Sequence, residues 1–368
     1  MSVPSELRSV LEPFIEDLKA RETISGIGLF GSWGRGEAVS SSDVDLLIVE
    51  DEDFDYEYVE RIELNGYLVD LNYIPKRWVA YRVPPEIDQK IYELKVLFDR
   101  DNLLERAKNL MFKVYWRPER VEIRTESHLV EADAYLSRAR LAFNKEDYQS
   151  VKVNSVRAFR SLMKILTEIG RNPVLNSSFM RNLESSSEKL GMSDLYEEYV
   201  KLMGFTEIDK ADVESMLNSL LSAWRGMISF IAANSDVAKT IHPRVSRWLK
   251  YYGRETFLKG LAARVKTLIE ECKPIESAHY MLHTLADMLE NYIFLVSRVE
   301  SARFDYASIL KCLRESRRSP TEVYQESLKV LGVEEVSSRM AEEALDTVTK
   351  TTINIREKRK DLIVRFIG

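Results

Sequence analysis

Residues 31–45 read Gly-Ser-Trp-Gly-Arg-Gly-Glu-Ala-Val-Ser-Ser-Ser-Asp-Val-Asp. The apolar run Ile24–Phe30 precedes them and the apolar run Leu46–Val49 follows. The pattern predicts a strand, a glycine-rich turn with a short helix, and a second strand. Side chains alternate along a strand, so Asp43 and Asp45 are expected on one face, where two bare carboxylates would repel each other. A divalent cation that prefers oxygen ligands, such as Mg²⁺, would remove that repulsion.

The glycines of this turn favour phosphate binding. A chain without Cβ atoms can approach a ligand closely, and successive backbone N–H groups in such a turn form an anion-binding concavity. A phosphate site beside a carboxylate metal site predicts chemistry on a nucleoside triphosphate. Residues 26–31 also spell the dinucleotide-binding pattern. We reject that interpretation because its first two glycines lie inside the apolar run rather than after it.

The segments Gly31–Gly36 and Ser42–Leu46 together resemble the signature of the polymerase-β-like nucleotidyltransferase superfamily. The nearest form is that of the minimal and kanamycin-nucleotidyltransferase-like branch, Gly-Ser-x-Ala-Arg-Gly followed by Ser-Asp-x-Asp-Leu. Gly34 departs from it by standing where Ala is usual. The family has a third carboxylate on a neighbouring strand, and Asp70 within Gly66–Tyr73 supplies one. An isolated Asp-x-Asp would be an ordinary turn, but the Gly-Ser upstream and Asp70 downstream favour a site.

The resemblance covers about the first hundred residues and implies an α+β fold, in which a small mixed sheet flanked by helices precedes a large all-α region. It implies transfer of a nucleoside monophosphate from a triphosphate, with ATP expected, and release of pyrophosphate. The catalytic residues and ligands of two Mg²⁺ ions would be Asp43, Asp45 and Asp70. Gly31 and Ser32 would hold the β- and γ-phosphates. Arg35 would neutralise phosphate charge, with a structural salt bridge as the alternative.

The acceptor is expected to be a hydroxyl of an RNA end or a protein, since the helical part exceeds what a small acceptor needs. The alternative function is a non-catalytic or weakly catalytic, antitoxin-like module that binds a nucleotide or a protein. Homo-oligomers remain open. The phrase Asn144–Tyr148 followed by Val156–Leu162 resembles the helical domains that accompany such transferases, including the HEPN type. No Arg and His have the spacing of a HEPN ribonuclease, which disfavours that activity.

Composition indicates a cytoplasmic globular protein. The net charge of −6 divides into −10 over residues 1–100 and +4 over the remainder, so any contact with nucleic acid is expected from the second part. No apolar run approaches the ~18–20 residues of a membrane span, and Met1–Ser5 lacks the features of a secretory signal. Cys272 and Cys312 are too few for a disulfide framework or a zinc site.

Three domains are expected, over residues 1–115 (catalytic), 116–235 (helical) and 236–368 (a second helical domain or an extension). In the first, Asn65-Gly66 predicts a hairpin between Tyr56–Leu64 and Tyr67–Tyr73 that returns Asp70 to the Asp43/Asp45 strand. Long helices are expected further on, over Val121–Phe143, Ser150–Ile169, Phe257–Cys272, Ser277–Val299 and Ser338–Arg356.

Residues 244–259 alternate basic with aromatic side chains, Arg244, Arg247, Lys250, Arg254 and Lys259 with Trp248, Tyr251, Tyr252 and Phe257. Such a segment can bind a nucleic-acid backbone and stack on bases. The simpler interpretation, which we favour, is an amphipathic helix with solvated Lys and Arg. His279 and His283 lie one helical turn apart, and without a further ligand we interpret them as packing residues.

Overall fold

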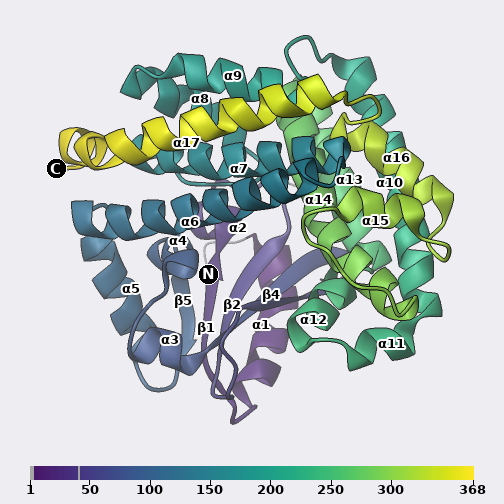
Figure 1. Ribbon diagram of the computed structural model, residues 1–368. Helices are drawn as coiled ribbons and strands as arrows, with labels where there is room; N and C mark the ends of the chain where they lie inside the picture. Colours follow the sequence, from purple (N-terminus) through teal and green to yellow (C-terminus); the bar gives the residue numbers. More distant parts are fainter. Residues whose placement is uncertain (1–3, 40–41) are drawn as a thin grey trace. The chain divides into compact units, whose positions relative to one another are not determined.

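The structure is a computed structural model that describes residues 4–39 and 42–368. The chain forms two compact units (Figure 1). The first comprises the described residues up to Arg117 together with Ser246–Arg264, and the second comprises Pro118–Val245 and Val265–Gly368. The predicted α+β fold, a sheet domain followed by a large helical region, is confirmed. The three predicted domain ranges stay a prediction.

The first unit contains a five-stranded mixed sheet, with the strand order β3-β4-β2-β1-β5. Its strands are β1 (Ile24–Phe30), β2 (Val44–Glu50), β3 (Tyr58–Leu64), β4 (Tyr67–Pro75) and β5 (Lys95–Asp99). Strands β2 and β4 run parallel, and the other neighbours are antiparallel. The parallel pair lies at the centre of the sheet and carries Asp45 and Asp70.

Helices cover both faces of this sheet. On one face α1 (Ser5–Lys19) packs Leu7, Leu11 and Ile15 against β1, β2 and β4. The other face is covered by α3 (Lys76–Ala80), the 3-10 turn η1 (Pro85–Ile87), α4 (Asp88–Tyr92) and α5 (Leu103–Val114). Alternate β2 side chains enter the two cores, because a strand points successive residues to opposite faces. This is why β2 is almost wholly apolar after Asp45.

The predicted hairpin is confirmed. Asn65 and Gly66 both have positive φ, at 47° and 86°, as a two-residue type I′ turn requires. The turn pairs Leu64 with Tyr67 and, three residues further back, Arg61 with Asp70. Strand β4 then runs beside β2, with Asp70 opposite Asp45. A local turn thus sets the place of the third carboxylate.

The second unit is helical in its described elements. Helices α6 (Pro118–Phe143) and α7 (Tyr148–Ile169) form an antiparallel pair, and α17 (Ser338–Phe366) packs along both (Figure 1). The other helices that lie wholly within this unit are α8 (Phe179–Leu190), α9 (Ser193–Met203), α10 (Lys210–Ala233), α11 (Ser235–Thr240), α14 (Pro274–Val299), α15 (Ile309–Glu315) and α16 (Thr321–Leu331). No helix in the described part of the chain is both long and apolar enough to span a bilayer.

Two helices contribute residues to both units. They are α12 (Pro243–Tyr252) and α13 (Glu255–Glu270), and their part from Ser246 to Arg264 belongs with the sheet. A segment that follows the sheet by more than a hundred residues in the sequence thus belongs to the same unit as the sheet.

Candidate active site

The structure brings the three predicted carboxylates together at one end of the central strands. Asp45 and Asp70 are direct neighbours in the parallel pair β2–β4, so their side chains leave the same face of the sheet. Asp43 lies just before β2, which begins at Val44, so it belongs to the connecting loop and not to the predicted strand. Asp43 and Asp70 nevertheless share one arginine, and the negative charges of both act on Asp45.

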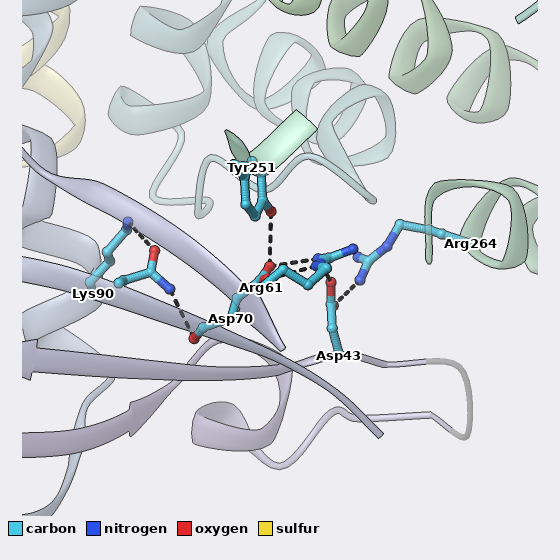
Figure 2. Close-up of polar contacts among 7 residues, drawn as sticks. Asp43, Arg61, Asp70, Lys90, Tyr251 and Arg264 are labelled. Atoms are coloured by element: carbon cyan, nitrogen blue, oxygen red, sulfur yellow. Dashed lines mark hydrogen bonds and ion pairs between the residues drawn. The ribbon is translucent and has the colours of Figure 1, made fainter. Parts of the chain in front are cut away.

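Arg61 from β3 holds that shared position (Figure 2). Its Nε donates to Asp70 Oδ1 and its Nη2 to Asp70 Oδ2, both at 2.6 Å. The same Nη2 also donates to Asp43 Oδ2 at 2.6 Å. Arg61 is 4% exposed, so three charge-assisted hydrogen bonds operate with little competition from water. The guanidinium therefore acts as the positive counter-charge of two site carboxylates.

Residues of the 246–264 segment complete this arrangement. The Tyr251 hydroxyl donates to Asp70 Oδ2 at 3.0 Å, and Arg264 Nη2 bonds Asp43 Oδ1 (Figure 2). The rings of Tyr251 and Phe257 lie 5.6 and 5.2 Å from the Arg61 guanidinium, within the range of cation–π attraction. Arg254 Nη1 donates to the backbone oxygen of Arg61 at 2.8 Å. Contacts from segment 246–264 thus help to hold Arg61 against the carboxylates.

The pKa values of Asp43 and Asp45 are shifted in opposite directions. Burial raises the pKa of Asp43, but Arg264 and Arg61 outweigh it, so the pKa of Asp43 lies below its usual value. Burial and the negative charges of Asp43 and Asp70 hold the pKa of Asp45 well above its usual value. None of the described residues donates a hydrogen bond to the Asp45 carboxylate. Among the described residues, Asp45 is thus the site carboxylate without an ion pair, although the charges of Arg264 and Lys90 partly oppose the rise of its pKa.

The glycine-rich turn lies directly against Asp45. Gly31 has φ +67°, and a Cβ at this position would stand 2.2 Å from Asp45 Oδ2. The Gly31 N–H, predicted to bind phosphate, donates to Glu93 Oε1 at 3.1 Å. Within the described chain, the Ser32 hydroxyl has no hydrogen-bond partner. Gly31 allows the close approach that brings turn and carboxylate together.

Arg35 forms the salt bridge that the sequence left as the alternative. Its Nη1 contacts Glu93 Oε2 and its Nε contacts Glu37 Oε2, both at 2.7 Å. Burial lowers the pKa of Arg35, yet the two glutamates outweigh it and raise the pKa overall. Glu93 thus contacts both Gly31 and Arg35. Burial raises the pKa of the Glu93 carboxyl group.

The donor set suits Mg²⁺ in its chemistry, since carboxylate oxygens are the ligands this ion takes. The close negative charges that raise the pKa of Asp45 are what such an ion would compensate. In the arrangement seen here, however, the described residues present no group of three Asp, Glu, His or Cys side chains placed to hold a metal. Arg61 and Arg264 hold Asp43 and Asp70 instead.

Sequence reasoning missed Arg61, Tyr251 and Arg264. The signal for Arg61 was present, because counting back from the two-residue turn pairs it with Asp70. Opposite charges on directly paired residues attract each other across a hairpin. Tyr251 and Arg264 lie 181 and 221 residues from their partners; Tyr251 belongs to the basic and aromatic segment 244–259, but no local pattern pairs either residue with a carboxylate.

The basic residues of 244–259 follow the favoured interpretation in part, because Arg244, Lys250 and Lys259 are exposed while Arg247 and Arg254 are half-buried. Arg247 stacks on Tyr58, with its guanidinium carbon 3.5 Å from the ring centroid. Lys250 Nζ lies 2.6 Å from Glu60 Oε1. These side chains contact acidic and aromatic residues of β3 instead of pointing only into solvent, so much of the segment's basic charge is used within the unit.

Comparisons with known proteins identify the family of the first unit. Residues 11–110 match a family model described as a nucleotidyltransferase domain. Two proteins of Methanocaldococcus jannaschii, provisionally named protein adenylyltransferases, are each 35% identical to the chain over 68 and 71 residues. The matches cover 68% and 70% of those proteins and 18% and 19% of this chain.

A nucleotidyltransferase-like protein from Exiguobacterium sibiricum aligns over 89% of both chains, with a TM-score of 0.34 and 13% identity, which is too little to carry an argument. The family assignment depends instead on the domain model and the two relatives, of which the chain covers more than two thirds. The chain therefore belongs to the nucleotidyltransferase family, with its nucleotidyltransferase domain in residues 11–110.

Proposed function

We propose that this protein transfers AMP from ATP to a hydroxyl group of a protein. The observation that carries the proposal is the meeting of Asp43, Asp45 and Asp70 beside the turn at Gly31. The names of the two archaeal relatives favour ATP as donor and protein as acceptor. An RNA end is the other acceptor that the sequence leaves open, and the experiment below separates the two.

In the proposed reaction the acceptor oxygen attacks the α-phosphorus of ATP and forms a new P–O bond. The bond from that phosphorus to the bridging oxygen breaks, and pyrophosphate leaves with the bonding electrons. The acceptor proton passes to a site carboxylate, for which the sequence favours Asp70. Ser32 would offer the phosphates its hydroxyl, which has no hydrogen-bond partner among the described residues. The residues thus act mainly by positioning and by charge.

The three carboxylates would hold Mg²⁺, which when bound supplies positive charge to the triphosphate and to the attacking oxygen. Arg61 occupies both oxygens of Asp70 and one of Asp43. We therefore also propose that Arg61 releases these carboxylate oxygens before the nucleotide binds. Arg264 faces the same exchange at Asp43.

Incubation with α-³²P-labelled ATP, Mg²⁺ and a cell extract tests the proposal. Wild-type protein should place label on a protease-sensitive, nuclease-resistant product, and Asp45→Asn should abolish labelling. The matched control is Asp53→Asn, because Asp53 is an exposed aspartate of the same unit. Nuclease-sensitive label would indicate an RNA acceptor. Equal labelling by wild type and Asp45→Asn would refute the assignment of the site.

One observation favours the alternative, a non-catalytic nucleotide-binding or protein-binding module. Arginines already neutralise Asp43 and Asp70, as they would if the site no longer needed a metal. Calorimetric titration with ATP distinguishes the two functions. An enzyme should bind ATP more tightly with Mg²⁺ than with EDTA and should release pyrophosphate. A non-catalytic module should show no Mg²⁺ dependence and no pyrophosphate.

A further inference from the structure

The second unit contains a polar cavity of about 280 Å³ that the proposed transferase chemistry does not use. It is partly open to solvent and lies between α6, α7, α14 and the segment before α8. The charged side chains that line it are Glu131, Arg157, Arg160, Lys164 and Asp287. Since a single water needs roughly 10–15 Å³ by this measure, the cavity has room for a small organic ligand as well as an ion.

Most of these charges are matched within the unit. Arg157 contacts Asp287 at 2.6 Å and Glu290 at 2.8 Å. Lys164 contacts Glu131 at 2.7 Å. These two cations thus face three carboxylates, so each positive charge already has an ion-pair partner beside it.

Arg160 differs from its neighbours because no carboxylate in the described chain pairs with it. Its Nη2 donates to the amide oxygen of Asn176 at 3.1 Å, and its guanidinium lies 5.8 Å from the Phe179 ring centroid. Its Nε is buried without a hydrogen-bond partner among the described residues. A buried N–H donor without a partner is costly. The three cations and three carboxylates around the cavity balance overall, and Arg160 is the cation that, among the described residues, has no carboxylate within salt-bridge distance and one unused donor.

A histidine pair beside the cavity adds further unused polar atoms. Tyr199 Oη lies 3.1 Å from His279 Nε2 and 2.8 Å from His283 Nε2. The two histidines are 1% and 3% exposed. Burial and the positive charge of Arg160 lower the pKa of both, so both rings are neutral at pH 7.

The Tyr199 phenol has a single proton and can donate it to only one of the two histidines, so the two rings must be different tautomers. One ring accepts the Tyr199 proton at Nε2 and carries its own proton on Nδ1, while the other donates from Nε2 and has a bare Nδ1. Both Nδ1 atoms are buried without a partner among the described residues. The pair thus offers one unused donor and one unused acceptor. His283 lines the cavity itself.

We propose that this cavity binds a phosphate group, either as free hydrogenphosphate or as a small phosphate monoester, with Arg160 as its principal cation. A phosphate carries several acceptor oxygens for Arg160 and the histidine N–H, and its protonated form has a hydroxyl for the bare Nδ1. A carboxylate could accept from Arg160 but offers no such hydroxyl. The site is independent of the carboxylates near Gly31, so it stands or falls apart from the transferase proposal.

Equilibrium dialysis with ³²P-labelled inorganic phosphate tests this binding on the full chain. The Arg160→Gln variant should bind about tenfold more weakly or worse, since a hydrogen bond to a charged group is worth ~1.5–3 kcal/mol. Arg140→Gln is the matched control, because Arg140 is exposed on the neighbouring α6. Asp45→Asn should bind phosphate as tightly as wild type, which assigns the binding to the second unit.

Histidine side-chain ¹⁵N spectra provide a second readout that does not depend on affinity alone. Phosphate should shift an Nδ1 resonance of the His279/His283 pair in wild type but not in Arg160→Gln. Glycerol phosphate in place of inorganic phosphate tests whether a monoester fits. Absence of saturable binding at millimolar phosphate, or equal binding by wild type and Arg160→Gln, would overturn the proposal. Equal competition by acetate would overturn the assignment of phosphate.

Discussion

Arg61 on β3 and Asp70 on β4 are directly paired across a hairpin, and their side chains form two parallel hydrogen bonds of 2.6 Å. Arg61 and Asp70 are 4% and 5% exposed. Such a bidentate pair has both strength and a fixed geometry. Because Arg61 also holds Asp43, the state of this one side chain determines how much of the carboxylate site is open to another cation.

Replacing Arg61 by Met should therefore destabilise the protein and increase its response to metal. Removing one partner of a buried ion pair costs about 3–5 kcal/mol, because the other charge is left without compensation. Mg²⁺ should restore part of this loss, so its addition should raise the Tm of Arg61→Met more than that of wild type. Thermal unfolding with Mg²⁺ or EDTA measures both effects.

The control for that experiment is Arg77→Met, because Arg77 pairs with the nearly fully exposed Asp53. An exposed pair contributes roughly 0–1 kcal/mol, so this variant should unfold like wild type and show the wild-type response to Mg²⁺. If Mg²⁺ raised the Tm of all three proteins equally, Arg61 would not compete with a metal for these carboxylates.

Two glycines of the turn offer a matched pair of substitutions. Gly31 and Gly36 both have positive φ, at 67° and 81°, but a Cβ at Gly31 meets Asp45 while a Cβ at Gly36 meets nothing within 4 Å. Gly36→Ala should cost about 1–2 kcal/mol for the left-handed backbone alone. Gly31→Ala should cost more, because Asp45 must also move, and it should lose ATP binding. Urea denaturation measures the loss of stability, and calorimetry measures ATP binding. Equal losses of stability in Gly31→Ala and Gly36→Ala would contradict the close contact between Gly31 and Asp45.

Local signals in the sequence were sufficient for the sheet and for part of the site. The run Ile24–Phe30 forms β1 over the predicted residues, and Asn65-Gly66 forms the predicted turn. Both depend on neighbours in the chain, namely apolar periodicity and backbone freedom at a turn. The same turn fixes the pairing of Arg61 with Asp70, so this contact was predictable from register even though charge alone does not indicate it.

The contribution of residues 246–264 was not predictable in this way. Their alternation of basic and aromatic residues favours a solvated amphipathic helix and is also compatible with nucleic acid, but it does not indicate the carboxylates of the site. The contacts Tyr251–Asp70 and Arg264–Asp43 join residues that are 181 and 221 positions apart in the sequence. An isolated sequence carries no periodic pattern for such a pairing, because its two members belong to different elements far apart in the chain.

Gly260 in α13 provides a test of that distant contact. Gly→Ala inside a helix normally stabilises it by about 1 kcal/mol. Here a Cβ would stand 2.5 Å from Arg61 Nη1 and 2.8 Å from Leu68 Cδ1, so we expect Gly260→Ala to destabilise the protein instead. A double-mutant cycle with Arg61→Met measures the coupling. The penalty should shrink when Arg61 is absent; an unchanged penalty would assign it to Leu68 alone.

The stability of the second unit should depend on pH through Glu168. Burial raises the pKa of Glu168, but His128 and Arg124 outweigh it, so its pKa in the folded protein lies below the usual 4.5. Arg124 Nη2 lies 2.9 Å from Glu168 Oε2, and both side chains are buried. The unfolded chain binds the proton first as pH falls, so this stabilisation is complete above pH 4.5 and is lost as pH falls further.

Glu168→Gln cannot take up that proton, so its free energy of unfolding should fall less steeply than that of wild type below pH 4.5. The slopes should differ by at most about 1.4 kcal/mol per pH unit, the limit for one proton. Urea denaturation between pH 7 and pH 3.5 measures them. Glu188→Gln, which changes an exposed glutamate on α8, should retain the wild-type slope. Parallel curves for wild type and Glu168→Gln would show that the Arg124–Glu168 pair does not link folding to protonation in this range.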